Sequence, residues 1–105
     1  MAWIALIVAG LLEVMWAYCM KLSDGFTRPG PTIAMIIFMA ASFGLLAWAM
    51  RRLPLGTSYM VWTGIGAVGA FVVGVTLLGE SASPLRIGAA ALIVGGIVLM
   101  KAATP

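Results

Sequence analysis

Long apolar stretches alternate with short polar breaks along this chain. Between residues 2 and 20 Glu13 is the only charged side chain, and a second uncharged stretch covers residues 32–50. A helix of the first length extends about 28 Å, enough to cross the hydrocarbon core of a bilayer. Residues 21–31 combine charges with glycine and proline, which predicts a surface loop.

Two further apolar stretches follow the break at residues 51–56. The third covers residues 57–78, with no charge before Glu80. Ser83 followed by Pro84 is typical of a helix start, because the hydroxyl can cap and the ring tolerates the first helical position. We therefore predict one transmembrane domain over residues 1–105, an all-α integral membrane bundle of four helices at about 2–20, 32–50, 57–78 and 84–101.

Composition excludes several other classes of protein. Of 105 residues 64% are hydrophobic and 9% charged, and the mean hydropathy is +1.17, far above the value for a water-exposed surface. Cys19 is the one cysteine and histidine is absent, so no disulfide, metal site or cofactor is expected. The basic residues are scattered, which is typical of loops that contact anionic lipid headgroups. They form no continuous face for nucleic acid.

Basic residues are divided equally between the two predicted sides of the membrane. Arg51, Arg52 and Lys101 lie on the side of the N-terminus, and Lys21, Arg28 and Arg86 lie on the other. The positive-inside rule therefore gives no direction. Either another factor sets one orientation, or both orientations are made. In the second case two copies could associate antiparallel and supply an inverted repeat, so a homodimer would be the functional unit.

Glu13 is an ionisable group near the middle of the first span. Ionisable side chains at a helix centre cost roughly 2.5–3.5 kcal/mol to insert and mark functional sites by default. Removal from water favours the neutral form of a carboxyl group, so a proton and a cation would compete for Glu13. The alternative is a structural role, with a protonated Glu13 hydrogen-bonded across helices.

Other side chains in the spans suit a cation site around Glu13. Gly10 and Trp16 lie about one turn on either side of it along the same helix. Aromatic rings can stack on a flat cation or donate hydrogen bonds to a carboxylate, although aromatic residues also pack without function. The polar and aromatic candidates on the second and third spans are Ser42, Tyr59 and Trp62. Ser42 is the weaker one, since serine often bonds back to its own helix.

Glycine is concentrated in the third and fourth spans. Such residues permit close approach of helices, and ordinary tight packing is the simplest explanation. The Gly64-Ile65-Gly66 step is also a plausible helix bend. Gly88 and Gly95 are seven residues apart and share one helix face, which predicts a possible dimer contact.

Taken together, these segments resemble the small multidrug resistance family, specifically its guanidinium-exporter subtype, along essentially the whole chain. The resemblance rests on the acidic first helix around Glu13, the loop at residues 21–28, and the segment at residues 54–66. It implies an antiparallel dual-topology homodimer in a bacterial inner membrane. In that dimer both Glu13 carboxylates would bind either protons or one substrate cation, and the protomers would exchange conformations.

The resemblance also implies roles for the other candidates. Trp16, Ser42, Tyr59 and Trp62 would hydrogen-bond to Glu13 and shape the pocket, with Gly10 beside it. Gly64 and Gly66 would bend the third helix, and Gly88 and Gly95 would join the fourth helices of the dimer.

Three functions are compatible with these sequence features. Trp16 and Ser42 favour guanidinium export, because the quaternary-ammonium subtype of the family typically has a small residue at the first position and an aromatic residue near the second. A broad quaternary-ammonium exporter is the first alternative. An accessory membrane subunit is the second, and it would tolerate loss of Glu13. An enzyme is not expected, since no nucleophile is accompanied by a base.

Overall fold

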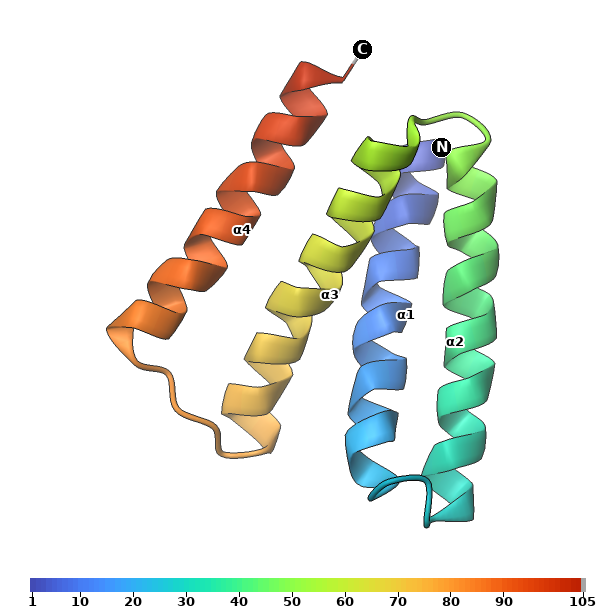
Figure 1. The fold of residues 1–105 in the computed structure, drawn as a ribbon, viewed down its shortest axis with the longest axis vertical. Coiled ribbons are helices and arrows are strands. Elements are labelled where there is room, and N and C mark those ends of the chain that lie inside the picture. The colour runs from blue at the N-terminus through green and yellow to red at the C-terminus, as the bar shows by residue number, and fades with distance from the viewer. Residues whose placement is uncertain (105) are drawn as a thin grey trace.

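Residues 1–104, which the computed structural model describes, form four helices and no strand, and they confirm the all-α prediction. Pro105, the last residue of the predicted domain, lies outside the described residues. All four helices are long and apolar enough to cross a membrane. Their bounds are α1 Ala2–Leu22, α2 Pro29–Met50, α3 Leu55–Leu77 and α4 Pro84–Ala103 (Figure 1).

The main difference from the predicted ranges is at the start of α2. Pro29 and Pro31 were expected in the surface loop, but both belong to the first turn of the helix. Proline is tolerated there because the first N–H groups of a helix have no partner within it. Arg28 precedes the helix in an extended conformation, as a residue before proline prefers. The connecting turn is consequently shorter than predicted.

Helix α1 has the most extensive contacts in the bundle, although only α3 packs against all three other helices. Helix α1 packs against both α2 and α3, whereas α4 packs only against α3 and leans away from the other helices (Figure 1). The buried core lies between α1, α2 and α3 and combines small with bulky apolar side chains. Its members are Ala5, Leu6, Ala9, Leu46, Ala49, Val61 and Trp62.

Glycines bring α1 and α3 close together. A Cβ at position 10 would lie 2.7 Å from the Ile65 Cβ, and one at position 69 would collide with Val14. A side chain at position 66 would likewise collide with the carboxyl group of Glu13. Helix α3 continues without a break through residues 64–66, so these glycines serve close approach, while the bend stays a prediction.

Helix α4 presents an unpartnered apolar face. None of its residues among those described is buried, and a Cβ at Gly88 or Gly95 would meet nothing within 4 Å. Leu92 on the same face is 80% exposed. Such a face suits lipid or a second copy, so the predicted dimer contact stays a prediction.

Candidate functional site

The Glu13 carboxyl group lies at the contact between α1 and α3, near the middle of the membrane-spanning helix. Its Oε1 atom is buried and has no hydrogen-bond partner among the described residues. The absence of a side chain at Gly66 makes room for this group against the α3 backbone. A buried acceptor without a partner costs free energy, and a proton or an N–H donor at this oxygen would remove that cost.

A hydrogen-bond chain connects three helices beside Glu13. The Trp62 indole Nε1 of α3 donates to the Ser42 hydroxyl of α2 over 3.0 Å. The Ser42 hydroxyl in turn donates to the backbone carbonyl of Ala9 on α1 over 2.7 Å. The Ser42 hydroxyl is therefore satisfied both as donor and as acceptor. These two hydrogen bonds hold the Trp62 indole near Ala9, which lies one turn before Glu13 on α1.

Four aromatic rings form a continuous cluster next to this chain. Phe43 is at its centre, with ring centroids 6.2 Å from Trp16 and 5.7 Å from Trp62. Tyr59 extends the cluster, since its ring centroid lies 5.7 Å from that of Trp62. Ring faces of this kind attract organic cations. The Trp16 Nε1 donor is buried without a partner among the described residues, which leaves it available to an acceptor.

The structure brings Trp16, Ser42, Tyr59 and Trp62 together but does not connect them to Glu13 by hydrogen bonds, so their predicted role in the pocket stays a prediction. In the single chain Ser42 bonds to the Ala9 carbonyl and Trp62 bonds to Ser42. The reason is geometric, because the carbonyl one turn before Glu13 is within reach of the serine.

Gly10 has a packing role in this chain, since the side chain of Ile65 covers it. Its predicted place in the pocket beside Glu13 stays a prediction.

Sequence reasoning missed two contributors to this region. Phe43 joins the aromatic rings, and the Ala9 carbonyl accepts the hydrogen bond from Ser42. Gly66 was a candidate for a helix bend, and the structure shows that it also accommodates the Glu13 carboxyl group. Phe43 directly follows the one serine in an apolar stretch, but an aromatic residue there is equally typical of a lipid-facing position. A backbone carbonyl has no signal in the sequence.

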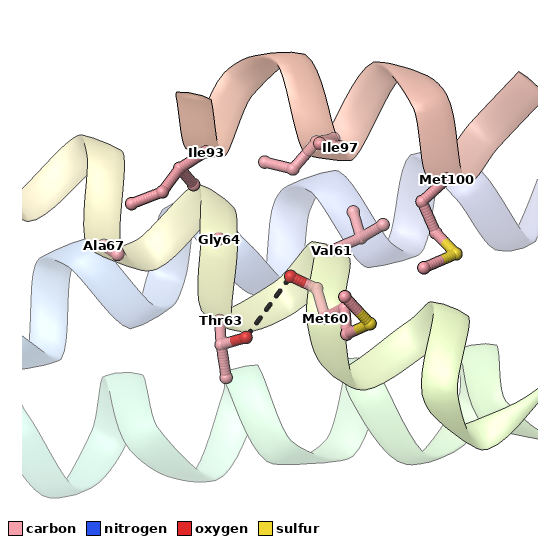
Figure 2. A pocket seen from close by; sticks show the side chains of 9 residues that line it. Met60, Val61, Thr63, Gly64, Ala67, Ile93, Ile97 and Met100 are labelled. Atoms are coloured by element: carbon pink, nitrogen blue, oxygen red, sulfur yellow. Dashed lines mark hydrogen bonds between the residues drawn. The ribbon is translucent and has the colours of Figure 1, made fainter. Parts of the chain in front are cut away.

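Two apolar grooves flank the contact between α3 and α4, and neither is lined by Glu13. The groove in Figure 2 has a volume of about 360 Å³. Ile93 and Ile97 project into it from α4, and Met60 and Met100 lie at one end (Figure 2). The Thr63 hydroxyl is satisfied by the Met60 carbonyl of its own helix over 3.2 Å. None of the residues that line this groove is charged, so it offers no carboxylate to a cation.

Comparison with known proteins identifies close relatives. A family model described as "Small Multidrug Resistance protein" matches residues 1–93. The chain is 55% identical to a protein of Escherichia coli K12 named "Guanidinium exporter", over 99% of both chains. It is 57% identical to proteins of the same name from Citrobacter freundii and Salmonella typhimurium, again over 99% of each chain. The matched region includes Glu13 and every aromatic residue of the cluster.

Proposed function

This chain belongs to the small multidrug resistance family, and on that premise we propose that it exports guanidinium and small guanidinylated cations in exchange for protons. The family and its four apolar helices make it a multi-pass protein of a bacterial inner membrane. It is a transporter and not an enzyme. The substrate follows from the name shared by the relatives and from the chemistry of the Glu13 region.

One observation carries the proposal, namely the buried and unpartnered Oε1 of Glu13. A proton satisfies this oxygen by forming the neutral acid. Guanidinium satisfies it differently, because its planar fork of N–H donors can meet a carboxylate through two parallel hydrogen bonds. Either ligand neutralises the charge, so the two compete for one carboxylate and their movements are coupled in opposite directions.

We further propose that the working unit is an antiparallel homodimer. In the single chain Tyr59 is 52% and Phe43 46% exposed, so one wall of the aromatic cluster is uncovered. A second copy in the inverted orientation would cover it and add a second Glu13. The equal division of basic residues supports this arrangement, and Gly88 and Gly95 offer a face for contact between the fourth helices. Exchange of the two protomers' conformations would open the site to each side in turn.

A broad exporter of quaternary ammonium ions is the second candidate. The aromatic cluster centred on Phe43 favours it, since cations without N–H donors bind through ring faces. Such an ion would leave the Glu13 oxygen without a hydrogen bond. The two candidates therefore differ in whether donor hydrogens on the substrate matter.

Parallel transport of guanidinium and tetramethylammonium under one proton gradient tests the choice. Attraction to the Glu13 charge is common to both ions, so selectivity must come from hydrogen bonds. An unpaired buried acceptor costs roughly 1–3 kcal/mol, so we expect guanidinium to be preferred about five- to hundredfold. Ser42→Ala and Trp16→Gly should both reduce this ratio more than they reduce expression. Comparable currents for the two ions would favour the quaternary-ammonium exporter.

A further inference from the structure

A second groove lies between α1, α3 and α4, on the side of the α3–α4 contact opposite the groove in Figure 2. Its volume is about 580 Å³, and Trp3, Ile7 and Lys101 are among the residues that line it. It continues into a neighbouring hollow through the shared residues Ile65, Ile97 and Val98, and that hollow reaches Leu11. From Trp3 to Leu11 the combined groove runs roughly 12 Å along α1.

The depth of this groove matches one leaflet of a membrane. Half of the hydrocarbon core measures about 15 Å, and the groove begins at the end of the bundle and extends toward its middle. Its wall is apolar except at the open end. In the hydrocarbon region such a hollow holds no water, whereas an acyl chain lying along α1 fills it with matching van der Waals contacts.

The open end carries a positive charge. The Lys101 Nζ lies 5.2 Å from the centroid of the Trp3 ring, which places the ammonium group at the level where interfacial tryptophan side chains contact headgroups. Among residues 1–104 no Asp or Glu side chain forms an ion pair with Lys101. The groove in Figure 2 has no charged residue in its lining, so the two grooves differ in the feature that would select a headgroup.

We propose that this groove binds a phospholipid with a negatively charged headgroup, its phosphate on Lys101 and one acyl chain along Ile7, Ile65 and Val98. The charge of Lys101 selects a negatively charged headgroup, and the apolar wall of the groove binds the acyl chain. A lipid in this position packs against both α1 and α4, which do not pack against each other in the single chain. The bound lipid would therefore stabilise the position of α4 against the other helices. The inference needs only that the chain spans a membrane and is independent of the transported substrate.

Native mass spectrometry of the full-length protein tests the headgroup contact, with dioleoylphosphatidylglycerol and dioleoylphosphatidylcholine supplied in equal amounts. We expect the wild type to retain phosphatidylglycerol preferentially. Lys101→Gln should lower this preference about fivefold, the effect of one cation near an anionic surface. Arg51→Gln is the matched control, since it removes an exposed charge from the same side outside the groove, and it should change the preference less than twofold.

A second pair of variants tests the acyl-chain contact with every charge intact. Val98→Trp, at a position that is 62% exposed, should fill the groove and lower phosphatidylglycerol retention. Ile37→Trp, at a similarly exposed site on α2, should leave retention unchanged. Equal losses in the Lys101 and Arg51 variants would overturn the proposal, as would full retention by Val98→Trp. A wild type that retains both lipids equally would also overturn it, because Lys101 would then not select the headgroup.

Discussion

At the scale of single residues, the Glu13 carboxyl group depends on a missing side chain across the helix contact. Its position against α3 is available because residue 66 is glycine. The neighbouring Gly64 has a different partner, since a Cβ there would lie 2.8 Å from the Ile97 Cδ1 on α4. Two glycines that look equivalent in the sequence therefore make room for side chains on opposite sides of α3, and of the two Gly66 is the one next to Glu13.

Gly66→Ala should impair transport by displacing the Glu13 carboxyl group. The added methyl group would collide with that group, so the carboxylate must leave its position or the helices must separate. We expect guanidinium transport in proteoliposomes to fall at least tenfold. Gly44→Ala is the control, because a Cβ there would meet nothing within 4 Å, and it should retain transport within about twofold. Equal activity of the two variants would contradict the assigned role of Gly66.

Charged, polar and aromatic side chains are conspicuous in apolar spans, and for that reason the sequence offered Glu13, Trp16, Ser42, Tyr59 and Trp62 as candidates, whose functional roles stay predictions. It could not identify their partners, since the Ser42 hydroxyl bonds to a backbone carbonyl that any residue at position 9 would provide. Contacts across helices depend on rotation and depth, which hydrophobic patterning does not specify here, because these helices are apolar on nearly every face.

At the scale of helices, two consecutive hydrogen bonds connect α1, α2 and α3. Trp62, Ser42 and the Ala9 carbonyl each come from a different helix. Hydrogen bonds between membrane helices contribute modestly when formed, but a broken one leaves buried groups without partners. The hydrogen bonds of Ser42 thus contribute to the stability of the fold as well as to the position of the aromatic cluster.

Ser42→Ala should destabilise the protein because the Trp62 N–H and the Ala9 carbonyl both lose a partner. We expect the free energy of unfolding to fall by roughly 1–3 kcal/mol, measured by titration with a denaturing detergent. Thr76→Ala is the matched control, since the Thr76 hydroxyl is exposed and bonds only to the Val72 carbonyl of its own helix. An equal loss of stability in both variants would mean that the hydrogen bonds between helices contribute no more than one within a helix.

The number and order of helices followed from the sequence, whereas the start of α2 did not. Pro29 and Pro31 are loop residues by composition, and only the backbone of the first turn explains why they are helical. The outlying position of α4 was also not predictable. Its apolar composition resembles that of the other helices, and the sequence does not indicate which faces find partners.

At the scale of the whole molecule, the chain has three basic residues toward each side. One side has Arg51, Arg52 and Lys101, and the other side has Lys21, Arg28 and Arg86. The four-helix topology places both termini on one side, so a single tag reports the orientation. The uncovered aromatic wall and the unpartnered face of α4 are both surfaces that a second, inverted copy would cover.

A reporter fused to the C-terminus should be found on both faces of the membrane. Because the balance is equal, two lysines added next to Arg28 should fix one orientation, and two added next to Arg51 should fix the other. Co-expression of the two fixed forms should restore transport that each form alone lacks. Finding the reporter of the unmodified chain on one face only would exclude the antiparallel homodimer.

We propose that Glu13 couples guanidinium to protons, and guanidinium uptake into proteoliposomes under an imposed proton gradient is the direct test of that coupling. Glu13→Gln keeps the volume of the side chain and removes its charge and its titration. Glu80→Gln is the matched control, since that carboxylate is exposed and paired with Arg86 at 3.3 Å. We expect gradient-driven guanidinium uptake by the wild type and by Glu80→Gln, and none by a correctly inserted Glu13→Gln. Uptake by Glu13→Gln at the wild-type rate would contradict the proposal.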